Sequence, residues 1–150
     1  MSGIDALTKD SQAQQQWVKR FVAFIIDAII VFIPLVILTV IVSIFIALGG
    51  IFSVGLLLGG VISIFWSLLF VLYFAVTESM WGASFGKRFM TLKVVNKTGG
   101  KPTIVEGLIR NISKIYWLLL LLDIIVGLAV TKGYQQKYTD QIAGTRVTPA

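Results

Sequence analysis

The sequence predicts an all-α integral membrane protein with about three transmembrane helices. Hydrophobic residues make up 57% of the 150-residue chain and charged residues 13%, whereas a soluble domain averages about 25% charged residues. Long apolar stretches also recur along the chain, and a helix needs about 20 such residues to cross the hydrocarbon core of a bilayer. We therefore expect a helical hairpin, a third and partly amphipathic helix, and an ordered basic loop between them.

The chain begins with a polar segment. Residues 1–16 are expected to form a loose or surface-lying leader, followed by a membrane domain over residues 17–148. Trp17 and Arg20 have the aromatic and cationic character of a membrane interface. The first span is predicted over residues 21–48, because this apolar run is longer than the core of a cleavable signal peptide, which has about 7–15 residues.

A second span without any charge is predicted over residues 51–76. A short glycine-containing segment joins it to the first span, so the two helices should form an antiparallel hairpin. Small residues recur at every fourth position of the second span, namely Gly55, Gly59, Ser63 and Ser67. Such a row lets another helix approach closely, so the pattern indicates helix packing rather than catalysis. The partner is either the first helix or another subunit.

Residues 77–102 differ in character, because lysine and arginine crowd them. Glu78 is expected at the membrane interface, where the second span ends. Alternation of apolar and polar residues over 89–95 predicts a short strand, and residues 96–100, Asn-Lys-Thr-Gly-Gly, predict a turn. The loop should therefore be ordered against the membrane surface, and a short β-hairpin is one form it can take.

The third helix has a defined start. Thr103 and Glu106 have the spacing of a capping box, in which each side chain satisfies a free backbone amide of the first turn. Arg110 and Lys114 follow on the same polar stripe and are expected to snorkel outward. The third span is predicted over residues 108–130 and needs these amphipathic turns to cross the bilayer. The alternative is a re-entrant segment, but we favour three crossings.

The placement of positive charge predicts the orientation. With three crossings, ten basic residues share the side of the N-terminus: Lys9, Lys19, Arg20, Lys87, Arg88, Lys93, Lys97, Lys101, Arg110 and Lys114. The positive-inside rule places this side in the cytoplasm of a cell-membrane protein. The basic residues left on the other side instead favour a re-entrant third segment. The expected partners are the lipid bilayer, anionic lipid head groups, and either further copies of the chain or another membrane protein.

Three charged residues near or within the spans are candidates for ion or proton binding. A carboxylate at mid-helix costs about 2.5–3.5 kcal/mol on insertion scales, so Asp27 and Asp123 need a partner or a proton. Arg20 precedes Asp27 by two helical turns and lies on nearly the same face. Two facing carboxylates would share a proton or hold a cation between them. The alternative is structural: Asp27 pairs with a cation and fixes helix packing, while Asp123 points into the helix interface or reaches the head groups on the far side.

Several function classes are not expected from the composition. The chain has no Cys and no His, which removes disulfides, thiolate zinc sites and the usual general base. We expect no enzyme activity, no cofactor and no metal site, because neither a nucleophile–base pair nor a metal-ligand cluster is recognisable. The formal net charge of +6 does not predict nucleic-acid binding, because the basic residues flank the apolar segments and no recognition module is recognisable.

Four segments together resemble the RDD family, small multi-pass membrane proteins named for one arginine and two aspartates. Arg20 and Asp27 match the family's first helix. Residues 82–87, Gly-Ala-Ser-Phe-Gly-Lys, match its Gly-x-Ser/Thr-x-Gly-Lys segment. Residues 108–111 match the arginine–asparagine start of its last helix, and residues 140–147 match its ending, Asp-x-x-Ala-Gly-Thr-x-Val.

The resemblance covers about residues 17–148 and implies both motif residues and a choice of functions. The motif residues are Arg20, Asp27, Asp140, Gly82, Gly86, Lys87, Gly144 and Thr145, with Asp123 as the alternative second aspartate. The family is associated with transport, including cation/proton exchange, and with partnership in larger membrane complexes. We expect a transporter of a small solute or of cations and protons, acting as an oligomer because three helices cannot enclose a pathway alone. The alternative is a non-catalytic accessory or scaffold subunit that docks through the Gly55 and Gly59 face.

Overall fold

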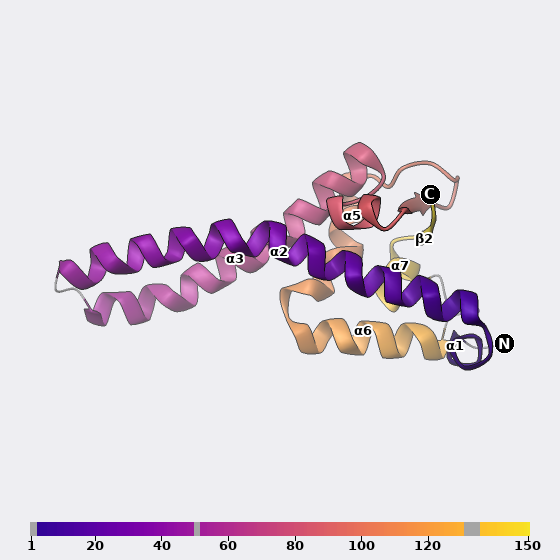
Figure 1. Cartoon of the computed structure of the whole chain (residues 1–150), viewed down its shortest axis with the longest axis horizontal. Helices are drawn as coiled ribbons and strands as arrows, with labels where there is room; N and C mark the ends of the chain where they lie inside the picture. The colour runs from indigo at the N-terminus through magenta and orange to yellow at the C-terminus, as the bar shows by residue number, and fades with distance from the viewer. Residues whose placement is uncertain (1–2, 50–51, 131–135) are drawn as a thin grey trace.

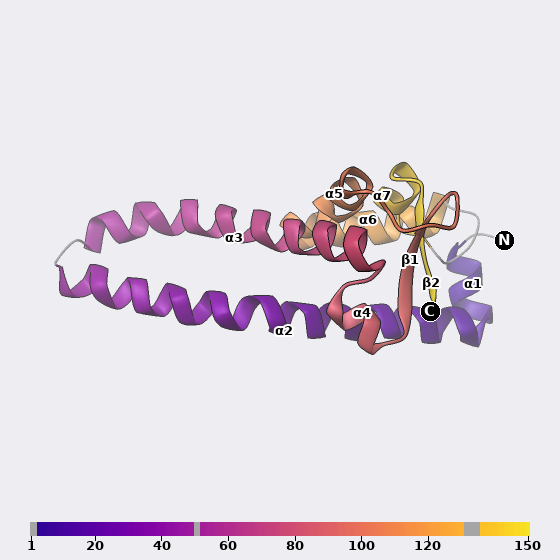
Figure 2. The same ribbon diagram turned by 90° about the horizontal axis from the view of Figure 1, so that it is seen from above.

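A long helical hairpin dominates the structure, a computed structural model that describes residues 3–49, 52–130 and 136–150. Its arms are α2 (Ser11–Leu48) and α3 (Phe52–Trp81), which run side by side (Figures 1 and 2). The remaining elements gather at one end of the hairpin, where α2 begins and α3 ends. This arrangement confirms the predicted all-α membrane class.

The N-terminal leader is helical rather than loose. α1 (Gly3–Lys9) ends just before Asp10, whose side chain accepts a hydrogen bond from the backbone of Gln12 at 2.8 Å and caps the start of α2. α2 therefore begins at Ser11, ahead of the predicted interface, and Gln16 is buried. At 38 residues, α2 is roughly 57 Å long at a rise of 1.5 Å per residue, so it extends well beyond a hydrocarbon core of about 30 Å.

Among the described residues, two helices are long and apolar enough to cross a membrane, α2 and the Gly59–Trp81 part of α3. The third apolar segment is divided. α5 (Ile104–Asn111) and the 3-10 helix η1 (Ile112–Ile115) meet α6 (Trp117–Val130) at an angle of 115°. Tyr116 has an extended backbone between them and produces the bend. The structure thus provides two crossing helices, or three if the bent pair counts as one broken span.

Aromatic rings and a side-chain hydrogen bond hold α2 against α3. Phe70 of α3 contacts two rings of α2, with centroid separations of 5.9 Å from Phe24 and 4.9 Å from Phe32. Trp66 donates its indole N–H to the hydroxyl of Thr39 at 3.2 Å. Large apolar side chains elsewhere on both helices are exposed, which suits a hairpin surrounded by lipid chains of similar polarity.

A two-stranded antiparallel sheet joins the basic loop to the C-terminal tail. β1 (Leu92–Asn96) pairs with β2 (Thr145–Pro149) so that Val94 lies opposite Val147. Both valines are buried with Leu92 in a small apolar core. The predicted strand is therefore present, but its partner is the C-terminal strand rather than a neighbouring segment of the loop.

The turn predicted after the strand is present as well. Asn96 accepts hydrogen bonds on its side-chain oxygen from the backbone N–H of Thr98 at 3.1 Å and of Gly100 at 2.9 Å. The chain then enters α5 through the predicted capping box of Thr103 and Glu106. The turn therefore leads into a helix, which explains why no returning strand pairs with β1 at this point.

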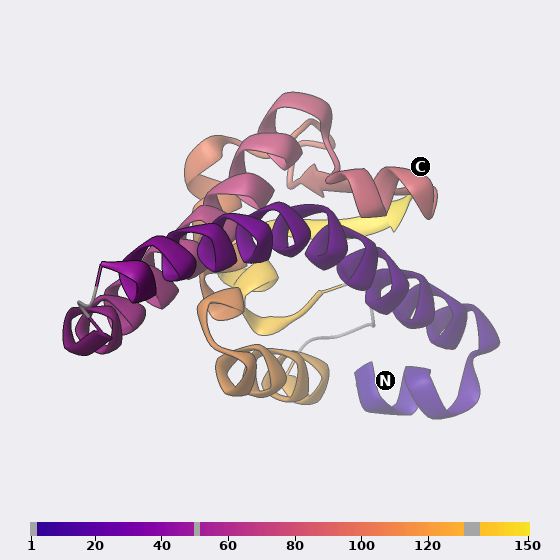
Figure 3. The same ribbon diagram turned by 60° about the vertical axis from the view of Figure 1, so that its left-hand side comes forward.

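The elements around the start of α2 and the end of α3 form what we call the base. It consists of α4 (Phe85–Phe89), the sheet, α5, η1, α6 and α7 (Tyr138–Ile142), as Figure 3 shows. The carbonyl oxygen of Val147 in β2 accepts hydrogen bonds from Gln16 at 2.7 Å and from Arg20 at 3.0 Å. The start of α2, the basic loop and the C-terminal tail are therefore in direct contact.

Candidate functional site: buried charge clusters in the base

Asp27 is the centre of a buried clamp between α2, α3 and the loop before α4. Its carboxylate is fully buried. It accepts three hydrogen bonds, from the Tyr73 hydroxyl at 2.7 Å, the Ser84 hydroxyl at 2.5 Å and the Gly86 backbone N–H at 2.7 Å. These donors replace the water that a buried carboxylate loses. The clamp therefore fixes the loop against α2 just beyond the end of α3.

The local geometry explains why the Gly-x-Ser-x-Gly-Lys segment has glycine at both positions. A Cβ atom on Gly86 would lie 2.0 Å from the carbonyl oxygen of Ala23 and 2.9 Å from Cγ of Asp27, so glycine is needed for α4 to approach α2 this closely. Gly82 has a φ of +75°, a left-handed conformation that glycine adopts without strain. The chain turns there after α3, and this turn directs the following residues toward Asp27.

A second cluster surrounds Glu78 near the end of α3. Glu78 is fully buried, and one of its oxygens pairs with Lys87. The other oxygen lies 3.3 Å from Nε of Arg110 and accepts a hydrogen bond from Asn111 at 3.0 Å. Burial lowers the pKa of Lys87 below its ordinary value, although the charge of Glu78 opposes this shift. Partners from α4 and α5 cover Glu78, so its carboxylate contacts other side chains of the protein rather than solvent.

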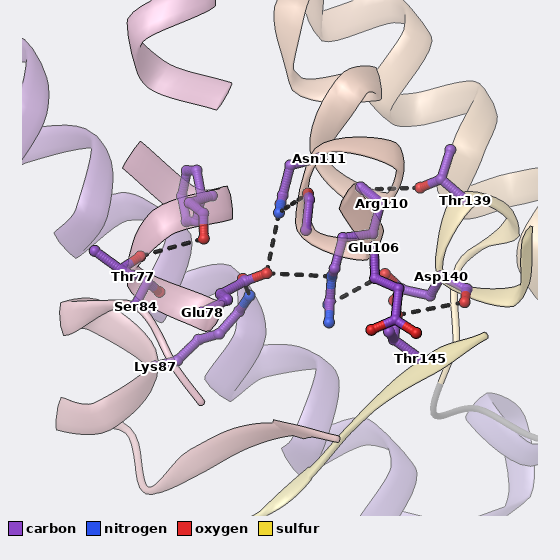
Figure 4. Close-up of polar contacts among 12 residues, drawn as sticks. Thr77, Glu78, Ser84, Lys87, Glu106, Arg110, Asn111, Thr139, Asp140 and Thr145 are labelled. Atoms are coloured by element: carbon purple, nitrogen blue, oxygen red, sulfur yellow. Dashed lines mark hydrogen bonds and ion pairs between the residues drawn. The ribbon is translucent and has the colours of Figure 1, made fainter. Parts of the chain in front are cut away.

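Arg110 links this cluster to the C-terminal tail. Its guanidinium lies between Glu78 and Asp140, with Nη2 3.1 Å from Oδ1 of Asp140 (Figure 4). Arg110 is only 2% exposed, so the prediction that it snorkels outward is wrong. The reason lies in Gly107, where a Cβ atom would lie 2.9 Å from Cα of Ala75. Glycine lets α5 pack closely against α3, and this packing buries the arginine.

Asp123 belongs to a third cluster, between α6 and α7. It pairs with Lys137 and accepts a hydrogen bond from the backbone N–H of Thr139 at 2.6 Å. The ammonium group of Lys137 also donates to the carbonyl oxygen of Arg110, which connects this cluster to the previous one. In the described part of the chain, Asp27 and Asp123 have different partners, so the structure does not bring these two candidate acids together.

The tail motif shapes the turn between α7 and β2. Gly144 has a φ of +67°, again a conformation suited to glycine. Thr145 is buried and donates its hydroxyl to the carbonyl oxygen of Asp140 at 3.4 Å. Its own carbonyl oxygen accepts a hydrogen bond from Gln136 at 2.7 Å. These contacts hold Asp140 where it meets Arg110.

Among the described contacts, Arg20 binds the C-terminal tail rather than Asp27. Its Nη2 donates to the carbonyl oxygen of Val147 at 3.0 Å, and its guanidinium carbon lies 4.8 Å from the ring centroid of Trp17. Arg20, Asp27 and Asp140 therefore act at three separate contacts. Arg20 joins α2 to the tail, Asp27 joins α2 to the loop, and Asp140 joins the tail to α5.

The small-residue row of α3 faces away from α2. Gly59 and Ser63 are exposed, and a Cβ atom on Gly59 would have no neighbouring atom within 4 Å. Ser67 donates its hydroxyl to the carbonyl oxygen of Ser63 at 2.9 Å, within the helix. The surroundings of Gly55 lie outside the described residues. The first helix is therefore not the partner of this row at Gly59 and Ser63.

Sequence reasoning found Asp27, Asp123 and Asp140 but did not assign Glu78 and Lys137 to the network of charges. The sequence could have identified Glu78, because it is the only charged residue between Asp27 and Lys87. The sequence could not have identified Lys137 in this way, because it belongs to a polar segment, where a lysine is ordinarily solvated. Its burial depends on contacts that come from other parts of the chain.

The fold and the buried clusters define a class, a small multi-pass membrane protein whose hairpin carries a compact base held together by internal ion pairs. Within this class, the family model of the RDD family matches residues 15–144. The chain therefore belongs to the RDD family, as its motifs predict. Comparisons with curated proteins and with solved structures find no match.

Proposed function

We propose that this chain is a non-catalytic subunit that assembles with other membrane helices through α3. The supporting observation is the exposed row at Gly59 and Ser63, which leaves space for another helix to approach. In lipid, helices associate through van der Waals packing and hydrogen bonds, and small residues allow that packing to be close. The partner is either a second copy of the chain or a different membrane protein.

The contacts of the buried acids favour assembly over transport. Asp27 accepts three hydrogen bonds, and Asp123 pairs with Lys137 while also accepting a backbone N–H. An acid that binds and releases a transported ion must exchange its partners during each cycle. At Asp27 such an exchange would break the clamp that joins α2, α3 and the loop, so this acid is better suited to hold the base together.

We infer that the base lies in the cytoplasm of a cell-membrane protein and that the third segment is re-entrant. All 13 Lys and Arg residues lie outside residues 21–86, and the positive-inside rule then favours a cytoplasmic base. Pairing of β1 with β2 supports a topology with the loop and the tail on the same side of the bilayer. The segment between them makes an even number of crossings, and the 115° bend before α6 fits a segment that enters and returns.

Cross-linking tests the proposed assembly surface, and the chain has no native cysteine to interfere. Ser63→Cys, labelled with a small thiol-reactive diazirine in native membranes, should give a cross-linked species on illumination. Ile64→Cys is the matched control, because it is 65% exposed and lies about 100° away around the same helix. The mass of the adduct distinguishes a second copy from another protein. Equal yields from the two positions, or none from Ser63→Cys, would contradict the proposal.

A second candidate function is transport of a small solute or of cations and protons by an oligomer. The observation that favours it is the run of buried charges from Glu78 through Arg110 to Asp140, since ionisable residues inside membrane proteins often mark ion pathways. Sealed liposomes with a trapped pH dye test this function under an imposed sodium or potassium gradient. Proton flux that disappears in Asp27→Asn would favour the carrier, and intact protein without flux would favour the assembly subunit.

A further inference from the structure

A cavity of about 330 Å³ lies in the base between α2, α5, α6 and the C-terminal tail. This volume is within the range of small-ligand sites, about 300–1,000 Å³. Its wall has two chemical parts, one cationic and one aromatic. The residues that matter here are Arg110, Lys114 and Lys137 on the cationic part and Trp17, Phe21 and Trp117 on the aromatic part. Such a wall suits an amphiphile with a negatively charged end.

Among the described residues, the basic groups on the wall of this cavity outnumber the acids that form ion pairs with them. Three cations on its wall form ion pairs with three acids, in the pairs Lys87–Glu78, Arg110–Asp140 and Lys137–Asp123. Lys114 is a further cation on the wall, and none of the described ion pairs includes it. Its ammonium nitrogen lies 2.9 Å from the ring centroid of Phe74. Among the described residues, the wall therefore has one basic side chain more than these three ion pairs use.

Arg110 contributes a donor that the protein itself leaves unused. Its Nη1 is buried and has no hydrogen-bond partner among the described residues, while its other nitrogens face Glu78 and Asp140. A buried donor without a partner costs free energy, and Arg110 belongs to the wall of the cavity. Lys114 lines the same cavity, so one anionic group can meet both side chains.

The aromatic part of the wall continues onto the exposed surface of the base. Phe21 is 65% exposed and Trp117 is 66% exposed. They belong to α2 and α6, whose outer faces carry exposed apolar side chains from Phe21 onward in α2 and from Trp117 onward in α6. An acyl chain can therefore leave the cavity along this face without passing polar groups. A small soluble anion would satisfy the cations but would leave the apolar wall uncovered.

We propose that the cavity binds one anionic phospholipid. Its phosphate lies beside Lys114 and Arg110, with an oxygen that accepts a hydrogen bond from Lys114, and one acyl chain lies against Trp117 and Phe21. The lipid supplies negative charge that the base lacks and connects α2 with the bent third segment. This site is separate from the small-residue row of α3, so it goes beyond the assembly function and does not depend on it.

Quenching of tryptophan fluorescence by brominated phospholipids tests the site, because Trp17 and Trp117 line the cavity. The full chain is reconstituted in phosphatidylcholine vesicles with a small fraction of either brominated phosphatidylglycerol or brominated phosphatidylcholine. The anionic probe should quench more strongly than the zwitterionic one. Lys114→Gln should weaken the apparent affinity for the anionic probe about tenfold, the effect of losing one hydrogen bond to a charged group. Lys114→Arg should retain the preference.

Lys93→Gln is the matched control, because it removes one exposed charge from β1, elsewhere in the base, without touching the cavity. An equal loss in Lys93→Gln and Lys114→Gln would indicate general attraction of anionic lipid and would overturn the site. Equal quenching by the two probes, or a failure of Lys114→Arg to bind, would also overturn it. Competition by inorganic phosphate would identify a soluble anion in place of lipid. Cross-linking at Ser63→Cys has its own readout, so either proposal can fail without the other.

Discussion

Glu78 illustrates how single residues stabilise this protein. Its carboxylate is fully buried and meets cations from two different elements, Lys87 of α4 and Arg110 of α5. A buried ion pair is not a large net source of stability, but removal of one partner leaves an uncompensated charge in a dry environment. The three side chains therefore depend on one another. The loss of stability on substituting any one of them is set by the other two, which would remain buried.

Glu78→Gln should destabilise the protein by roughly 3–5 kcal/mol, because Lys87 and Arg110 would stay buried after losing their shared negative partner. Thermal unfolding of the purified chain in a mild detergent measures this change. The double variant Glu78→Gln/Lys87→Gln should lose less than the sum of the two single variants, since residues in one network are coupled. Strictly additive losses would mean that the pair does not contribute as a unit.

At the scale of elements, two glycines decide how short helices pack on the long ones. Gly86 brings α4 against α2, where a Cβ atom would meet the backbone of Ala23, and Gly107 brings α5 against α3 at Ala75. In each case the close approach allows a nearby polar contact, the clamp on Asp27 in the first and the burial of Arg110 in the second. Packing and polar contacts in the base therefore depend on the same residues.

Gly86→Ala should destabilise the protein by about 1–3 kcal/mol, the typical cost of forcing extra volume into a packed contact, because α4 must move away from α2 and from Asp27. The melting temperature in detergent measures this loss. Gly100→Ala is the control, since a Cβ atom there would meet its nearest neighbour, a side-chain atom of Asn96, at 3.7 Å. An unchanged melting temperature in Gly86→Ala would contradict the contact between α4 and α2.

At the scale of the whole molecule, the sheet holds distant segments of the chain together. β2 is the last element of the chain, yet it pairs with β1 of the basic loop and binds the start of α2 through Val147. Three segments far apart in the sequence are thus held in one base. The sheet therefore supports the proposed re-entrant third segment, because a third crossing would separate the loop from the tail by the thickness of the bilayer.

Labelling of single cysteines in intact cells tests this topology. Gly49→Cys, at the end of α2 away from the base, should react with a membrane-impermeant maleimide added outside, because Gly49 is exposed at the far end of the hairpin. Arg146→Cys, which is exposed in β2, should react only after the cells are permeabilised. Reaction of Arg146→Cys in intact cells would instead support a third crossing. It would also contradict the pairing of β2 with β1.

Much of the architecture follows from the sequence by itself, because the signals involved are local. Hydropathy and length identify the two hairpin helices, the capping box locates the start of α5, and the motif residues of segment 82–87 are recognisable from their spacing. Asp27 is identifiable for the same reason, since a carboxylate within an apolar run requires partners whatever the fold.

Only the tertiary structure decided which groups of the protein are the partners of the buried polar residues. Asp27 and Asp123, each expected as a possible half of one site, belong to different clusters, and Arg110 points inward to Glu78 rather than outward. The pairing of β1 with the end of the chain was likewise not readable from the loop. The physical reason is the same in each case: burial of a polar side chain, like the pairing of a strand, is set by segments distant in sequence, and the local pattern carries no information about them.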